Sequence, residues 1–152
     1  MENEQKIITA CVEETIEAGS RFAEMLTLPD IVLLYGDLGV GKTEFCRGVC
    51  RYFGVEGKIT SPTFTIINQY FGMKDDFEFP IYHIDLYRIK NQKEFPEIGF
   101  NEFLYDDNSI KLIEWPEKYL SPYPENVIEV YFNFTPENKN KRIIRIIGSS
   151  KS

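Results

Sequence analysis

Residues 31–54 read IVLLYGDLGVGKTEFCRGVCRYFG, and this stretch decides the fold. The apolar run Ile31–Tyr35 predicts a buried strand, and Glu44–Gly54 has the spacing of an amphipathic helix, which is expected to start near Lys42. Between them, Gly36–Thr43 places two glycines, with four residues between them, before a lysine and a hydroxyl residue, which is the pattern of a phosphate-binding loop. The order strand, glycine-rich turn and helix therefore predicts a nucleotide-binding site.

The turn supplies the chemistry of phosphate binding. Its glycines allow left-handed backbone angles, so that successive N–H groups can point at phosphate oxygens, and the start of the helix adds the positive end of its dipole. We expect Lys42 to neutralise the β- and γ-phosphates and Thr43 to place its hydroxyl group on a magnesium ion. A Rossmann dinucleotide site is disfavoured, because Glu44 stands where a third glycine would be needed. The expected nucleotide contacts in the turn are Gly36, Asp37, Leu38, Gly39, Val40, Gly41, Lys42 and Thr43.

The helix after the turn has one apolar stripe, which is suited to packing on a sheet. The stripe includes Cys46 and Cys50, which we interpret as small core residues, because the three cysteines of the chain lack metal-ligand spacing with histidine. Gly54 is expected to end the helix as a left-handed cap. The stripe as a whole consists of Phe45, Cys46, Val49, Cys50 and Phe53.

A second pair of strands brings a carboxylate to the site. β-Branched and aromatic residues predict strands at Thr65–Phe71 and Ile81–Tyr87, joined by a polar loop at Gly72–Pro80. The short connection indicates an antiparallel hairpin. Asp85, near the end of its strand, is predicted to hold magnesium through water. His83, the only histidine, is interpreted as a hydrogen-bonded core residue rather than a catalyst.

A third strand carries a carboxylate and an aromatic ring at its tip. Ile110–Ile113 is a compact apolar run, and Pro116 stops it, which leaves Glu114 and Trp115 at the end of the strand. Trp115 is expected to form a wall or a docking surface there. The other predicted elements are an edge strand at Lys6–Ala10, a helix at Val12–Leu26, short helices within Lys93–Tyr105, and a closing hairpin of Val127–Phe134 and Arg142–Ile147.

These elements predict an α/β fold, a P-loop NTPase-like three-layer sandwich with a mixed parallel and antiparallel central sheet. Residues 1–152 are expected to form a single nucleotide-binding domain, with 43% hydrophobic and 14% aromatic residues. The net charge of −7 makes the chain a poor ligand for nucleic acid by itself. The acidic N-terminus and the absence of a long apolar run predict a cytoplasmic protein without a membrane span.

Three further segments join the phosphate loop, in order and at suitable spacing: SPTF at residues 61–64, HIDLYR at residues 83–88 and IEWPE at residues 113–117. Together with GDLGVGKT at residues 36–43 they resemble the TsaE (YjeE) family, small bacterial ATPases of tRNA threonylcarbamoyladenosine synthesis. The resemblance covers nearly the whole chain.

The resemblance implies an ATP-binding, weakly hydrolysing protein that works with the TsaB and TsaD proteins and contacts tRNA only through them. That complex installs threonylcarbamoyl on the adenosine beside the anticodon in tRNAs that read codons beginning with A. The implied role of the nucleotide cycle is to reset the complex between turnovers, since the family does not perform the transfer itself.

The resemblance also implies roles for single residues. Thr43 and Asp85 would serve magnesium, and Lys42 would bind phosphate. Thr63 would lie in a switch-like segment, and Glu114 would help to place magnesium or the attacking water. The predicted catalytic set is therefore Lys42, Asp85 and Glu114, the predicted metal set is Thr43, Asp85 and Glu114, and Thr63 and Trp115 join the nucleotide contacts. Two departures, Val40 for alanine and Glu44 for threonine, concern the tuning of hydrolysis more than binding.

Three alternatives stay open at this point. A small GTPase would need a glycine where Arg88 stands and a guanine-reading motif that residues 138–141 do not complete. A small-molecule kinase would usually have an arginine-rich lid, which residues 88–108 lack. A nucleotide-dependent structural partner would need binding but not hydrolysis.

Overall fold

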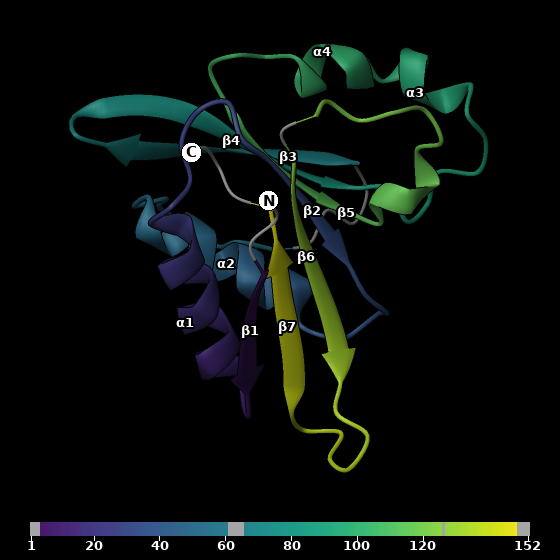
Figure 1. The fold of residues 1–152 in the computed structure, drawn as a ribbon. Coiled ribbons are helices and arrows are strands. Elements are labelled where there is room, and N and C mark those ends of the chain that lie inside the picture. Colours follow the sequence, from purple (N-terminus) through teal and green to yellow (C-terminus); the bar gives the residue numbers. More distant parts are fainter. Residues whose placement is uncertain (1–3, 61–65, 126, 149–152) are drawn as a thin grey trace.

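The computed structural model describes residues 4–60, 66–125 and 127–148. Within them, seven strands form one sheet in the order β1-β7-β6-β2-β5-β4-β3 (Figure 1). The strands are β1 (Glu4–Thr9), β2 (Ile31–Tyr35), β3 (Ile67–Lys74), β4 (Phe77–Asp85), β5 (Ile110–Glu114), β6 (Val127–Phe134) and β7 (Arg142–Ile147).

The sheet is parallel at its centre and antiparallel toward its edges. Strand β2 pairs in parallel with both β5 and β6, and β4 pairs in parallel with β5. Strands β3 and β7 run antiparallel to their neighbours β4 and β6, and β1 runs antiparallel to β7. The mixed sheet that the hairpins predicted is therefore confirmed. Because β2, β4 and β5 are parallel neighbours, their carboxyl ends meet at one edge of the sheet.

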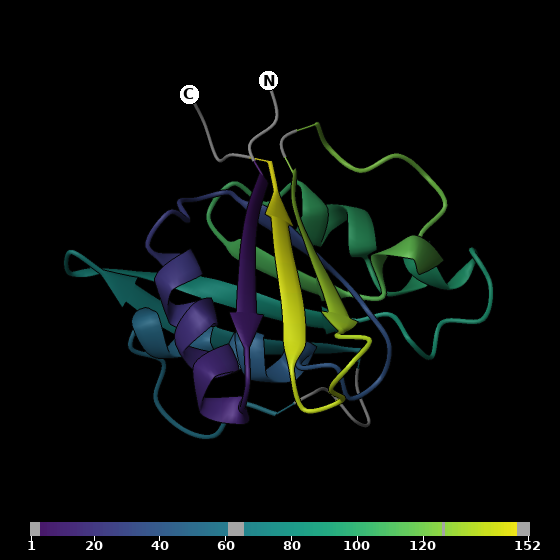
Figure 2. The same ribbon diagram turned by 60° about the horizontal axis from the view of Figure 1, so that its bottom comes forward.

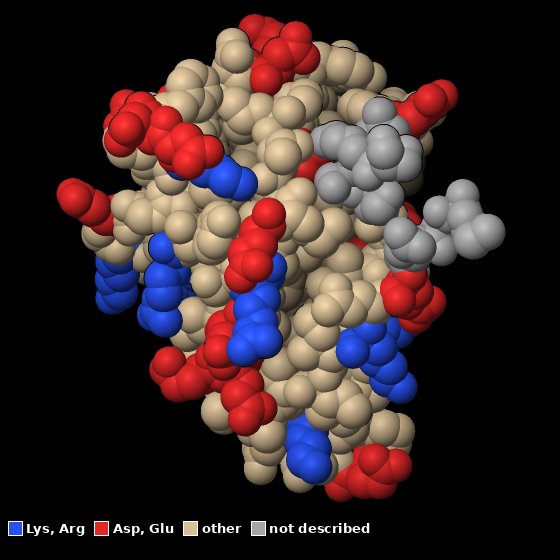
Figure 3. Space-filling model, turned by 60° about the vertical axis from the view of Figure 1, so that its left-hand side comes forward, with Lys and Arg blue, Asp and Glu red and all other residues tan. Residues whose placement is uncertain are grey.

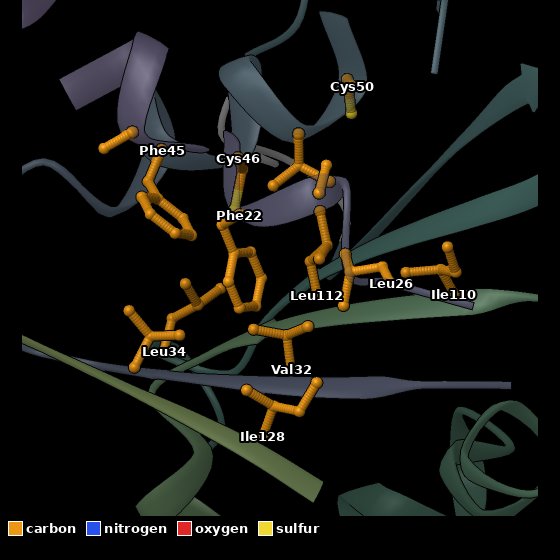
Figure 4. Packing of buried hydrophobic residues seen from close by; sticks show 14 of the residues in the cluster. Phe22, Leu26, Val32, Leu34, Phe45, Cys46, Cys50, Ile110, Leu112 and Ile128 are labelled. Atoms are coloured by element: carbon orange, nitrogen blue, oxygen red, sulfur yellow. The ribbon is translucent and has the colours of Figure 1, made fainter. Parts of the chain in front are cut away.

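Helices cover both faces of the sheet and complete three layers (Figures 1 and 2). Helices α1 (Val12–Ala23) and α2 (Lys42–Tyr52) bury one face, while the short helices α3 (Glu94–Glu97) and α4 (Phe100–Leu104) bury the other, in two separate apolar clusters. In the first cluster, Phe22 and Phe45 lie over Val32 and Leu34 of β2, as Figure 4 shows. A 3-10 turn, η1 (Pro116–Lys118), follows β5.

Helices α1 and α2 touch through two glycines. A Cβ atom built on Gly48 would lie 1.9 Å from the carbonyl oxygen of Ile16, and one built on Gly19 would lie 2.1 Å from that of Phe45. Real Cβ atoms essentially never approach other atoms closer than 3.0 Å. Only glycine therefore permits this helix spacing, which fixes α2, and with it the end of the phosphate loop, against α1.

Two sequence predictions need correction. The helix predicted at Val12–Leu26 ends at Ala23. The loop predicted at Gly72–Pro80 is for the most part strand, because only the two residues Asp75 and Asp76, with φ of 53° and 63°, turn between β3 and β4. Pro80 is tolerated inside β4 because pairing with β5 begins only at Ile81, so that at Pro80 the strand has β3 as its one neighbour.

The remaining predicted elements are present with small shifts of their ends. The edge strand is Glu4–Thr9 rather than Lys6–Ala10, and the closing hairpin has the predicted bounds. No helix among the described residues is both long and apolar enough to cross a membrane.

Candidate phosphate-binding site

The phosphate loop leaves β2 at Tyr35 and enters α2 at Lys42, as predicted. Its glycines have positive φ angles, 152° at Gly36, 75° at Gly39 and 113° at Gly41. At Gly36 a side chain is excluded by space as well, because a Cβ atom would lie 2.8 Å from Val40 Cγ1. The main-chain N–H groups of such a loop, together with the first turn of the 11-residue helix α2, form a cradle for an anion.

The predicted carboxylates lie side by side at the sheet edge that also carries the loop. Asp85 ends β4 and is the register partner of Glu114, which ends β5, and Glu114 in turn pairs with Leu34 of β2. Asp85 Oδ1 accepts a hydrogen bond from the backbone N–H of Tyr87 at 3.0 Å, which fixes its position at the strand end. The parallel pairing therefore brings Glu114 next to the strand from which the loop starts, and places Asp85 one strand further along the same edge.

A hydrogen bond joins the loop helix directly to β5. Thr43 Oγ1 donates to Glu114 Oε2 at 3.3 Å, although the two residues are 71 positions apart. The same oxygen lies 2.6 Å from Nε2 of His83 on β4. Glu114 is 4% exposed and His83 is 0% exposed, so their contact lies inside the protein, while the hydrogen bond from Thr43 is partly buried. The interpretation of His83 as a hydrogen-bonded core residue agrees with this position.

Lys42 is buried among acids. Its side chain is 4% exposed, and its ammonium group donates a hydrogen bond to the carbonyl oxygen of Gly36. Burial lowers the pKa of Lys42, and the neighbouring carboxylates oppose this effect by favouring the charged form. These carboxylates are Glu114, Asp85, Glu117 and Asp37. Such a site is suited to a polyphosphate bound to a divalent cation, because the ammonium group can bind the phosphate and the carboxylates can bind the cation.

Trp115 lies over the Lys42 ammonium group, and its role as a wall of the nucleotide site stays a prediction. The nitrogen is 4.0 Å from the ring centroid, which is within cation–π distance. Trp115 itself has φ of 58° and ψ of 47°, left-handed angles that are rare for a bulky residue and commonly mark functional positions. Its ring also contacts Tyr87, with centroids 5.0 Å apart. Pro116 begins η1 immediately afterwards, so the strand ends where the sequence predicted.

The oxygen donors at the site suit magnesium. Thr43, Asp85 and Glu114 offer a hydroxyl group and two carboxylates, and Mg²⁺ prefers oxygen ligands. Their assignment as ligands stays a prediction. Of the other predicted residues, Thr63 lies outside the described residues, and Asp37, Leu38, Gly39 and Val40 lie within the loop.

The structure also places Cys46 close to the site, which spacing along the chain did not indicate. Potential ligand atoms of Cys46, His83 and Glu114 lie within 4.8 Å of one another. Burial raises the pKa of the Cys46 thiol well above its usual range, so the thiol stays protonated, and a protonated thiol is a poor metal ligand. Cys46 and Cys50 are both fully buried in the core, as interpreted from the sequence.

A cavity of about 540 Å³ adjoins the outer side of the loop. Gly39, Gly41 and Glu44 line one wall, and Asn140 and Arg142 of the closing hairpin line another. Arg142 Nε donates to the carbonyl oxygen of Val40 at 3.1 Å, which ties the hairpin to the loop. No local motif indicated this cavity, because its walls come together only when β7 reaches its place in the sheet.

The surface charge gives no continuous basic tract on the face shown in Figure 3, where Lys and Arg side chains lie among Asp and Glu side chains. This mixed pattern agrees with the net charge of −7. That face therefore lacks the clustered positive charge typical of a surface that holds nucleic acid.

Comparison with known proteins agrees with this geometry. Residues 9–144 match the family model "Threonylcarbamoyl adenosine biosynthesis protein TsaE". The tRNA threonylcarbamoyladenosine biosynthesis protein TsaE of Rickettsia conorii is 44% identical over 142 residues, which are 91% of this chain and 75% of that protein. The protein of the same name from Synechocystis sp. is 36% identical over 126 residues, 77% of this chain and 73% of that protein. The crystal structure of Bacillus subtilis YdiB is similar with a TM-score of 0.77 and 26% sequence identity, and the match covers 98% of this chain and 88% of that chain. This chain therefore belongs to the TsaE family, whose role is in tRNA threonylcarbamoyladenosine biosynthesis.

Proposed function

We propose that this chain binds ATP with Mg²⁺ and hydrolyses it slowly, and that TsaB and TsaD partners stimulate this hydrolysis during threonylcarbamoyladenosine formation in tRNAs that read codons beginning with A. The observation that carries the proposal is the Thr43–Glu114 hydrogen bond, which joins the phosphate loop to a strand-end carboxylate. A loop that served only as a turn would have no need of a buried acid beside its hydroxyl residue.

Different groups of the chain bind the phosphates, hold the Mg²⁺ ion and orient the attacking water. Main-chain N–H groups of the loop and the start of α2 bind the phosphate oxygens, and Lys42 leaves the Gly36 carbonyl oxygen to neutralise the β- and γ-phosphates. Thr43, Asp85 and Glu114 would hold the Mg²⁺ ion. A bound Mg²⁺ ion would supply positive charge against the negative charge that develops on the phosphates. Glu114 also orients the attacking water, because phosphoryl transfer depends mainly on positioning and on charge stabilisation.

We propose that the cavity beside the loop takes the ribose and the base. Gly39 and Gly41 of the loop line it, and Asn140 offers both a donor and an acceptor for an adenine edge. The Asn140→Ala variant should weaken ATP binding more than it weakens binding of inorganic triphosphate. Equal losses for both ligands would show that the base lies elsewhere.

The charges at the site support the proposal that the isolated chain turns over ATP slowly. Four carboxylates act electrostatically on Lys42, so the transition state would gain from a further cation. A partner residue could supply it, as arginine fingers do elsewhere with effects of about 10³ to 10⁵ in rate.

The test has two steps. Calorimetry with ATP or GTP in the presence of Mg²⁺ should show binding of ATP in preference to GTP. ATP turnover and tRNA modification should then be measured with the chain alone and with TsaB and TsaD. Equal turnover in both cases would refute stimulation, and transfer of phosphate to a metabolite would favour the kinase alternative. A Lys42→Ala variant that still assembled and still supported modification would favour the structural-partner alternative.

A further inference from the structure

We propose that His83 is a positioning residue, which holds the carboxylate of Glu114 in the orientation that the nucleotide site requires. This inference rests on the proposed function, because it assigns Glu114 to the Mg²⁺-nucleotide site. Its observation is independent of that function: Nε2 of His83 lies 2.6 Å from Glu114 Oε2 in a fully buried contact between neighbouring strands.

The direction of the hydrogen bond follows from the acceptor. An ionised carboxylate has no hydrogen to donate, so with Glu114 ionised we assign Nε2–H of His83 as the donor. Nδ1 of His83 is buried and has no hydrogen-bonding partner among the described residues. The contact with Glu114 is therefore the polar interaction that fixes the ring, and the ring in turn fixes the carboxylate.

Both donors to Glu114 use the same oxygen. Oε2 accepts from His83 and from Thr43, and within the part of the chain that the structure describes no donor reaches Oε1. Two donors on one oxygen hold the carboxylate in one rotamer and direct Oε1 away from them. We infer that Oε1 faces the nucleotide.

His83 acts through Glu114 and not on the nucleotide. Its side chain is 0% exposed, and it lies on the face of β4 that also carries Ile81 of the core beneath α2. A donor that hydrogen-bonds to a metal ligand, and not to the metal itself, typically contributes 10- to 100-fold to activity or metal affinity.

Two substitutions at His83 separate hydrogen bonding from packing. His83→Leu fills much of the space without a donor, whereas His83→Gln keeps an amide N–H at a similar reach. We expect His83→Leu to lower the partner-stimulated kcat for ATP by about 10- to 100-fold with a change in KM of less than about threefold, and His83→Gln to restore most of the loss. Ile81→Val, a buried change on the same face of β4, is the matched control and should leave kcat unchanged.

A second readout needs neither nucleotide nor activity. His83 is the only histidine, so a long-range ¹H–¹⁵N spectrum of the free chain contains one imidazole. We expect a protonated Nε2 whose proton is shifted far downfield. That shift should be lost in Glu114→Met, which replaces the carboxylate with an apolar side chain of similar length. Identical imidazole signals in the two proteins would overturn the proposed contact, even if His83→Leu failed to fold.

These experiments distinguish failure of the positioning role of His83 from failure of the proposed function. If the unmodified chain bound no ATP, the proposed function would be wrong, while the imidazole spectrum would still decide whether the contact exists. If the unmodified complex turned over ATP and His83→Leu did so equally fast, the positioning role would be refuted and the proposed function would stand.

Discussion

The contact between α1 and α2 leads to a prediction that joins stability to nucleotide binding. Gly48→Ala adds a Cβ atom 1.9 Å from the carbonyl oxygen of Ile16 and 2.8 Å from the backbone nitrogen of Ser20. Both neighbours are backbone atoms and cannot rotate away. To reach a 3.0 Å contact, the carbonyl oxygen must retreat by about 1 Å, which moves one helix relative to the other.

The magnitude is a balance of two effects. Overpacking of a core typically costs 1–3 kcal/mol, and a steric conflict with backbone belongs at the upper end of that range. Alanine returns about 0.8–1.0 kcal/mol through its higher helix propensity. We expect a net loss of about 2 kcal/mol in the free energy of unfolding, which is roughly 4–8 °C in Tm for a domain of this size.

The assay is urea unfolding followed by circular dichroism, with ATP binding measured by calorimetry on the folded variant. Because α2 carries Lys42 and Thr43 in its first turn, ATP affinity should fall together with stability. Arg51→Ala, an exposed change in the same helix, is the control and should stay within about 0.5 kcal/mol of the parent. A Gly48→Ala protein as stable as the parent would refute the close helix contact on which the reasoning depends.

Three further predictions concern the site and the core. Lys42→Ala should weaken ATP binding by at least about 10-fold, because a hydrogen bond to a charged group contributes roughly 1.5–3 kcal/mol, and calorimetry on a variant with an unchanged far-ultraviolet spectrum would test this. The emission of Trp115, the only tryptophan, should change during an ATP titration, since its ring lies 4.0 Å from the ammonium group that must turn toward the phosphates; constant emission at calorimetric saturation would contradict it. Burial raises the pKa of the Cys50 thiol to about 12 from 9.0, so its neutral form stabilises the fold below pH 9, and that contribution is lost as the pH rises from 9 toward 12. Cys50→Ala should therefore weaken the fall of unfolding free energy in that window by up to about 1.4 kcal/mol per pH unit, which a series of denaturation curves at alkaline pH would measure.

The local features of the site could be predicted from the sequence because their causes lie within a few residues. The strand, the glycine-rich turn and the helix of residues 31–53 are contiguous, and each depends on local angles and periodicity. The same holds for Asp85 and Glu114, which stand at the ends of apolar runs that could be recognised individually. The hairpin of β3 and β4 was predicted as well, but its turn was placed too broadly, because Gly72 and Pro80 resemble strand breakers unless the pairing partners are known.

Sequence alone therefore determined a phosphate loop and the candidate acids that serve it, because these depend on patterns along the chain. Tertiary structure decided which side chains meet: β5 lies between β2 and β4, so Glu114 contacts both Thr43 and His83. The strand order also brings Cys46 near the site and the closing hairpin beside the loop. Contacts between residues 31 to 102 positions apart depend on the order of strands in the sheet, and no local pattern of residue types encodes that order.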